Sequence, residues 1–217
     1  MTHSRTKTCV SLVLNIAIAV LVAGAVVAMI TLGGDELAAD GVGAFQFFTV
    51  DSNILVAVAA VVCAIYQVRI LQGKATALPR WAQVLKLAGT AAVALTFLVV
   101  LCFLVPLADM PIAAMYGGSN FVLHLVSPLC AVAAYVFLDG MQRASATSLI
   151  WCGLPTLAYE VYYGITAFSH MQGGQVPLQY DWYHFLAAGP AMAAVIAPLF
   201  LAITLITALA LNRLARC

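Results

Sequence analysis

Residues 9–32 read CVSLVLNIAIAVLVAGAVVAMITL, an apolar stretch that contains no Asp, Glu, Lys or Arg. A transmembrane helix needs about 20 consecutive apolar residues to cross roughly 30 Å of hydrocarbon, and this stretch is long enough. It is longer than the apolar core of a secretory signal peptide, and no small-residue cleavage site follows it. The stretch therefore predicts a retained transmembrane helix.

Five further apolar runs follow the first one. They cover residues 44–71, 81–105, 120–138, 148–168 and 189–211, and turn-rich or charged segments separate them. The runs are continuously apolar and lack the alternation of β-barrel strands, so each is expected to be a helix. The pattern predicts an all-α membrane protein, with a single domain over residues 1–217 that forms a bundle of six transmembrane helices.

The composition agrees with lipid as the main solvent of the chain. Of 217 residues, 65% are hydrophobic and 8% are charged, whereas soluble domains carry about 25% charged residues. The formal net charge of +1 argues against nucleic-acid binding, which needs clustered excess basic charge. The six cysteines form no CxxC pair or metal-ligand spacing, and the sequence has no haem, nucleotide or flavin signature. No cofactor is expected.

The basic residues predict the orientation in the membrane. All nine Lys and Arg lie before the first run, after the last run, or around the second-to-third and fourth-to-fifth connections. The connections on the other side carry no Lys or Arg, but they carry Asp35, Glu36, Asp40, Asp109 and Asp181. Because basic connections stay on the cytoplasmic side, both termini are expected in the cytoplasm.

Three ionisable residues stand out inside the predicted hydrocarbon layer: Asp51, His124 and Glu160. Such residues are costly in lipid and are functional candidates by default. At a rise of about 1.5 Å per residue, they lie roughly 6–14 Å below the outer surface, each on a different helix. Three helices are therefore expected to place polar side chains in one slab of the outer half.

Helical spacing groups further polar residues with His124 and Glu160. Residues three or four apart share a helix face, which gives three polar stripes: Thr49, Ser52 and Asn53; Asn120, His124 and Ser127; Thr156, Glu160 and Tyr163, with Tyr159 alongside. His184 lies in an aromatic segment typical of a membrane interface. Asp51 is about 200° of helical rotation from Thr49, so it is not expected in the same cluster.

A Thr hydroxyl that faces a His imidazole meets the minimum requirement for acyl transfer, because the hydroxyl becomes nucleophilic when a base takes its proton. We expect Thr49 to be the nucleophile and His124 to be the base. Asn53, Asn120 and Glu160 are expected to orient the imidazole or to stabilise an oxyanion. At this depth the substrate is expected to be amphiphilic, with its acyl chain among the lipid tails.

Other interpretations of the same residues stay open. Ser, Thr and Asn also serve as hydrogen-bonding contacts between membrane helices, and Glu160 is a potential acceptor for neighbouring Tyr hydroxyls. Asp51, His124 and Glu160 suit the ion site or proton relay of a small transporter, although the chain shows no inverted repeat. A lipid-binding membrane protein without catalysis is a third interpretation. A metal site through His124, His170, His184 and Glu160 lacks the usual ligand spacing.

Four motifs resemble the androgen-induced gene family of membrane proteins, which includes the androgen-dependent regulator of tissue factor pathway inhibitor. They are FFTVDSNILVAV (47–58), NFVLHLVSP (120–128), PTLAYEVYYGI (155–165) and QYDWYHFL (179–186). The resemblance spans roughly residues 45 to 190 and is closest to the bacterial branch of the family.

The resemblance implies an intramembrane threonine hydrolase that cleaves fatty acid esters of hydroxy fatty acids, located in the plasma membrane of a bacterium. The family's Thr matches Thr49, and its His matches His124, with Asn120 four residues earlier. The implied partners are the bilayer and a lipid or fatty-acyl ester substrate. Supporting or substrate-binding roles are expected for Ser52, Asn53, Asn120, Tyr159, Glu160, Tyr163 and His184.

Overall fold

The computed structural model describes residues 5–32, 41–106, 111–183, 185–186 and 190–215. Five of its helices are long and apolar enough to cross a membrane: α1 (Arg5–Leu32), α2 (Phe48–Leu71), the helix Arg80–Leu104, the helix Gly118–Leu138, and α9 (Pro190–Leu214). These helices match five of the six predicted runs. The predicted fold class, an all-α protein with several membrane-length helices, is thus confirmed.

Two of the five helices change their winding along their length. The helix Arg80–Leu104 consists of α3 (Arg80–Val99) and a π-helical end, η2 (Val100–Leu104). The helix Gly118–Leu138 consists of four segments: α5 (Gly118–Phe121), the π turn η3 (Val122–Val126), α6 (Ser127–Ala133) and the π turn η4 (Ala134–Leu138).

Pro128 accounts for the position of the wider turn η3. Proline has no N–H to donate to the carbonyl four residues earlier, which is that of His124, and its ring crowds that carbonyl in a regular α-helix. A π turn directly before the proline relieves this conflict. The sequence therefore places the irregular turn at the residue that was predicted to be the base.

The fifth predicted run, residues 148–168, is not one continuous helix. It is divided between α7 (Ala146–Trp151) and α8 (Leu154–Ser169) by a turn at residues 152–153. Pro155 lies in the first turn of α8, where its missing N–H is tolerated, whereas inside a continuous helix it would remove a hydrogen bond. α8 has 16 residues, about 24 Å at 1.5 Å per residue, and is shorter than the five helices above.

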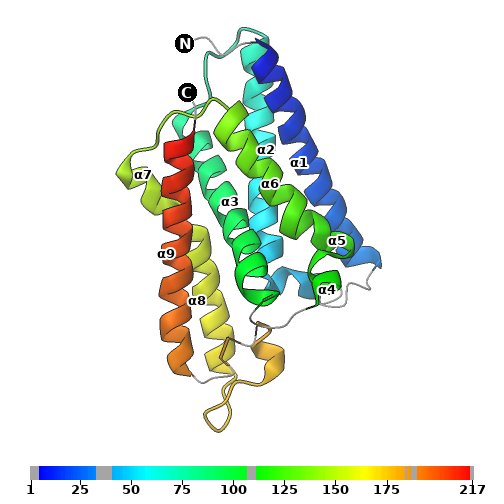
Figure 1. The fold of residues 1–217 in the computed structure, drawn as a ribbon, viewed down its shortest axis with the longest axis vertical. Coiled ribbons are helices and arrows are strands. Elements are labelled where there is room, and N and C mark those ends of the chain that lie inside the picture. The colour runs from blue at the N-terminus through cyan, green and yellow to red at the C-terminus, as the bar shows by residue number, and fades with distance from the viewer. Residues whose placement is uncertain (1–4, 33–40, 107–110, 184, 187–189, 216–217) are drawn as a thin grey trace.

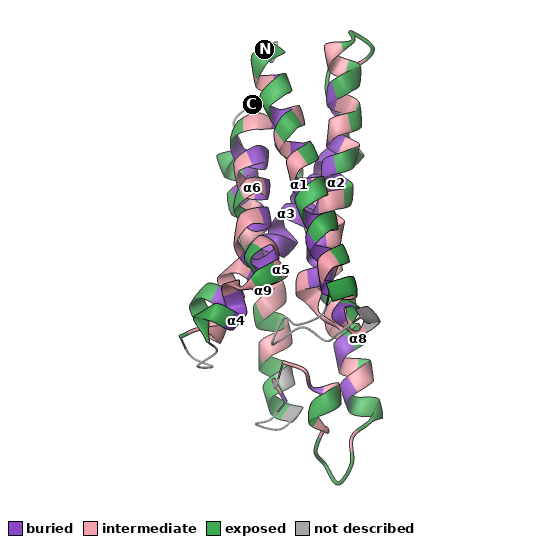
Figure 2. Ribbon diagram, turned by 90° about the vertical axis from the view of Figure 1, so that its right-hand side faces the viewer, coloured by how far each residue is buried: buried purple, intermediate pink, exposed green. Residues whose placement is uncertain are grey.

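The helix α3 occupies the centre of the bundle. It packs against α2, α6, α8 and α9 (Figure 1), and it is the most buried of the membrane-length helices (Figure 2). Gly89 allows the close approach of α3 to α2, because a Cβ atom at this position would lie 2.9 Å from the Cα atom of Val56. Outward faces instead expose Val13, Val27 and Ile65, as expected for surfaces in contact with lipid tails.

Three short elements lie together at one end of the bundle (Figure 1): η1 (Gly41–Gln46), α4 (Ile112–Tyr116) and η5 (Leu178–Tyr180). α1 begins and α9 ends at the opposite end, where the α2–α3 and η4–α7 connections also lie. The described Lys and Arg residues belong to this second end. Lys86 differs from the others because it is fully buried inside α3 rather than exposed beside the connection.

Candidate active site

Thr49 and His124 lie against each other between α2 and η3. The Thr49 Oγ1 atom is 3.3 Å from His124 Nε2, and the imidazole is buried. Thr49 belongs to the first turn of α2, and His124 belongs to the π turn η3. The hydroxyl and the imidazole therefore meet across the gap between two helices, as the sequence predicted.

A backbone carbonyl determines the tautomer of His124. Its Nδ1 atom lies 2.6 Å from the carbonyl oxygen of Met115, and because a carbonyl only accepts, Nδ1–H is the donor. In the neutral imidazole, Nε2 then carries the lone pair and accepts a hydrogen bond from the Thr49 hydroxyl. A hydroxyl, an imidazole and an acceptor for its second nitrogen are thus arranged in a row, as in a catalytic triad, with a carbonyl in place of the carboxylate.

Asn120 holds the segment that orients His124. Its Nδ2 atom donates to the carbonyl oxygen of Ala114 at 3.0 Å. Asn120 and His124 are one helical turn apart, and their side chains face the same short helix, α4. They bind the carbonyls of two successive residues there, Ala114 and Met115. Asn120 therefore acts on the imidazole indirectly, by fixing the position of its carbonyl partner.

Asn53 fixes the other side of the same turn. The Ser127 N–H donates to the Val122 carbonyl, which leaves the carbonyl of Leu123 without its usual helical donor. Asn53 Nδ2 donates to this Leu123 carbonyl at 3.0 Å and to the Thr49 carbonyl at 2.8 Å. Both N–H bonds of the amide are thus used for positioning, and Asn53 has none left to stabilise an oxyanion.

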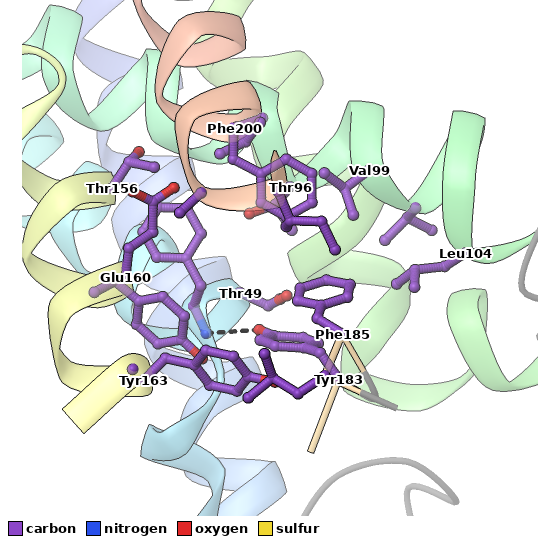
Figure 3. A pocket seen from close by; sticks show the side chains of 18 of the residues that line it. Thr49, Thr96, Val99, Leu104, Thr156, Glu160, Tyr163, Tyr183, Phe185 and Phe200 are labelled. Atoms are coloured by element: carbon purple, nitrogen blue, oxygen red, sulfur yellow. Dashed lines mark hydrogen bonds between the residues drawn. The ribbon is translucent and has the colours of Figure 1, made fainter. Parts of the chain in front are cut away.

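Tyr183 caps the helix that carries Thr49. The N-cap residue Phe47 makes no side-chain capping bond, and the Phe48 N–H instead donates to the Tyr183 hydroxyl oxygen at 2.9 Å, drawn as a dashed line in Figure 3. A helix start leaves four N–H groups unpaired, and this bond satisfies one of them. Burial raises the pKa of Tyr183 to about 12, so the phenol stays protonated at neutral pH.

Thr49 lies between two cavities. The larger has about 1010 Å³ of empty space and is lined mainly by apolar and aromatic side chains of α2, α3, α8 and α9 (Figure 3). The smaller has about 670 Å³ and is lined in part by His124 and Asn120. Thr49, Leu104 and Tyr183 border both cavities. Thr49 therefore borders a mainly apolar cavity and a second cavity whose lining is more polar.

Ser52 and Asp51 lie away from the imidazole. The Ser52 Oγ atom is 3.2 Å from the Thr49 carbonyl oxygen and 3.2 Å from Thr96 Oγ1, so Ser52 connects α2 to α3 beside Thr49. Ser52 makes no hydrogen bond to the imidazole of His124, and its expected supporting role stays a prediction. Asp51 borders a separate groove between α2 and α8, in agreement with its predicted direction.

Tyr159, Glu160 and Tyr163 all border the larger cavity. The Tyr159 hydroxyl donates to the Gln46 carbonyl at 2.7 Å, and the Tyr163 hydroxyl donates to Asp181. Since a hydroxyl has one proton to donate, neither tyrosine donates to Glu160, and the interpretation of Glu160 as their acceptor is wrong. Glu160 shares the cavity with Thr49 but has no hydrogen bond to the Thr–His pair.

A second buried polar cluster lies in the half of the bundle where α1 begins, and sequence patterns miss it. Lys86 Nζ donates to Asn15 Oδ1 at 2.6 Å and is 3.9 Å from Asp139 Oδ2. Asp139 Oδ1 accepts hydrogen bonds from Ser11, Asn15 and Gln67. A Lys inside an apolar run and a Ser–Asn pair four residues apart were the available signals, but only tertiary contacts bring them together.

Among the residues that the structure describes, no three His, Cys, Asp or Glu side chains are placed to hold a metal ion. His184, one of the predicted supporting residues, lies outside the described part of the chain. In comparisons with known proteins, no family model, no curated protein and no solved structure matches this chain.

Proposed function

We propose that this protein is an intramembrane hydrolase of lipid esters, with Thr49 as nucleophile and His124 as base. One observation carries the proposal: the Thr49 hydroxyl contacts the Nε2 atom of an imidazole whose Nδ1–H is held by a carbonyl, at the boundary of an apolar and a more polar cavity. The motif resemblance to the androgen-induced gene family supports the same chemistry, with fatty acid esters of hydroxy fatty acids as the substrate type.

The reaction follows from the tautomer of His124. Its Nε2 atom takes the hydroxyl proton while Thr49 Oγ1 forms a bond to the ester carbonyl carbon. The imidazolium then gives this proton to the alkoxide oxygen as the C–O bond breaks, which leaves the acyl group on Thr49. A water molecule, deprotonated by the same imidazole, releases the fatty acid and restores the hydroxyl. The second amide N–H of Asn120, which borders the smaller cavity, is the proposed donor to the oxyanion.

The proposed substrate position uses both cavities. The acyl chain lies in the larger cavity, whose mainly apolar lining suits a hydrocarbon chain. The ester carbonyl lies at Thr49, and the polar leaving group lies in the smaller cavity beside His124 and Asn120.

We further propose that the chain crosses a bacterial plasma membrane six times, with both termini in the cytoplasm. In this topology α7 and α8 together form the fifth crossing. The start of α1 and the end of α9 at one end of the bundle support an even number of crossings, and the basic residues at that end support its cytoplasmic location. The Thr–His pair then faces the outer leaflet.

The test is ester turnover by the purified protein in detergent, with a fatty acid ester of a hydroxy fatty acid as substrate. Thr49→Ala and His124→Ala are each expected to lower kcat by about 10²–10⁴-fold, because each removes one partner of the proton transfer. Thr31→Ala and His170→Ala are the matched controls, since both residues are exposed and lie outside the site; both variants should keep full activity. Unchanged turnover in both site variants would remove the proposed mechanism.

A further inference from the structure

Among the residues that the structure describes, one polar side chain that borders the larger cavity has a buried oxygen without a hydrogen-bond partner. Besides Thr49 and Glu160, five polar residues border this cavity, and each of the five has a hydrogen-bond partner in the protein. The pairs are Thr96 with Ser52, Thr156 with Thr204, Tyr159 with the Gln46 carbonyl, Tyr163 with Asp181, and Tyr183 with the Phe48 N–H. Glu160 differs from all of them. Its Oε1 atom is buried and has no hydrogen-bond partner among the described residues.

Glu160 is half-buried, and the cost of its position comes from the Oε1 atom, which is buried without a partner beside a mainly apolar cavity. A buried polar group without a partner costs about 1–3 kcal/mol in proteins, and a charged one costs more. No described Lys or Arg borders the cavity to compensate for it. A side chain that weakens the fold in this way, in a cavity that is otherwise apolar, is best explained by a ligand that supplies the missing partner.

The geometry indicates where on the ligand this partner lies. Glu160 extends from α8 and Thr49 extends from α2, and they border the same cavity at separate places (Figure 3). An acyl chain whose ester carbonyl is at Thr49 runs through the cavity and passes Glu160 at some point along its length. The partner group is therefore on the chain itself and separate from the ester.

We infer that Glu160 binds a free hydroxyl group on the acyl chain, so that the protein selects lipid esters with a hydroxylated chain. A hydroxyl is favoured over an ammonium group because the desolvation of a charge in an apolar cavity costs far more than that of a hydroxyl. A hydroxyl pairs with a carboxyl in either protonation state, because it donates to the ionised carboxylate and it donates to or accepts from the protonated acid. This inference rests on the proposed function for the location of the ester, but ligand binding tests it without turnover.

The experiment measures binding to the Thr49→Ala protein, which holds ligand without cleaving it. The probes are octadecanoate and its monohydroxy derivatives with the hydroxyl at successive positions, each in competition with a fluorescent fatty acid. One position along the chain is expected to bind at least about tenfold tighter than octadecanoate. Adding Glu160→Leu should abolish this preference, whereas Glu160→Gln should keep part of it because the amide still forms hydrogen bonds.

The affinity for octadecanoate controls for damage to the cavity, and it should change less than about twofold in both Glu160 variants. Equal binding of all probes, or a preference that survives Glu160→Leu, would overturn the inference. The two proposals fail separately. A hydroxyl preference in a wild-type protein that cleaves no ester would contradict the hydrolase alone, and ester turnover without any hydroxyl preference would contradict only the role of Glu160.

Discussion

At the scale of single residues, Asn53 shows how the site is held together. Its amide joins the Thr49 carbonyl to the Leu123 carbonyl, one residue before the imidazole. Thr49 and His124 lie on different helices, so the distance between their side chains depends on contacts of this kind. Pro128 forces the π turn, the π turn frees a carbonyl, and Asn53 uses that carbonyl to anchor α2.

Asn53→Ala is expected to lower both stability and activity. The substitution leaves the buried Leu123 carbonyl without a donor, which costs about 1–3 kcal/mol, and it loosens the contact between α2 and η3. Thermal unfolding in detergent should show a lower midpoint, and ester turnover per folded molecule should fall at least about tenfold. Asn212→Ala is the matched control, because Asn212 also bonds two backbone groups, those of Ala144, near the opposite end of the bundle. It should lower the midpoint but not the turnover, and equal turnover in the two variants would contradict a positioning role for Asn53.

At the scale of helices, the Lys86–Asp139 cluster joins elements that are far apart in sequence. Its residues come from α1, α2, α3 and the residue that follows η4, and all are at most 3% exposed. Breaking a buried ion pair by removing one partner costs about 3–5 kcal/mol, whereas neutralising both partners is much less harmful. The cluster is therefore expected to determine how these helices pack.

Lys86→Met should strongly lower the unfolding midpoint, because it leaves the Asp139 carboxylate buried without a countercharge. Adding Asp139→Asn should restore much of the loss, since the amide oxygen still accepts hydrogen bonds while the charge is gone. Lys74→Met, in the exposed α2–α3 connection, provides the control and should change nothing. A double variant no more stable than Lys86→Met alone would show that the pair does not act through its charge.

The helix boundaries also show which features a sequence pattern can predict. Five apolar runs became helices with ends within a few residues of the prediction, because hydrocarbon thickness determines their length. The broken fifth run and the turn η3 were not predicted, although Pro155 and Pro128 were visible. Hydropathy reports where a segment is apolar, but a proline changes the backbone hydrogen bonds without changing the hydropathy.

The same limit applies to the candidate site. Depth and helix face were sufficient to bring Thr49 and His124 together, because both quantities follow from the rise and rotation of a helix. They did not reveal the contact of Ser52 with Thr96, because Thr96 lies on a third helix. The role of Met115 was equally hidden, since the group that orients His124 is a backbone carbonyl, and no residue type encodes it.

At the scale of the whole molecule, the topology depends on whether α7 and α8 together cross the membrane. With six crossings, the loop around residue 175 is outside and the end of α9 is inside. If α7 and α8 do not cross, the two locations are exchanged. Gln175→Cys and Leu214→Cys are suitable probes because both positions are exposed, and Cys9 and Cys217 are replaced by Ser to lower the background.

A membrane-impermeant maleimide added to intact cells is expected to label Gln175→Cys but not Leu214→Cys. Both should react after the membrane is permeabilised. Lys74→Cys controls for leakage, because the proposed orientation places the α2–α3 connection in the cytoplasm for five and for six crossings, so it should react only after permeabilisation. The other native cysteines, among them the exposed Cys102, are replaced by Ser as well, so that they add nothing to the labelling. Labelling of Leu214→Cys in intact cells, with Gln175→Cys protected, would show five crossings and would place the C-terminus outside.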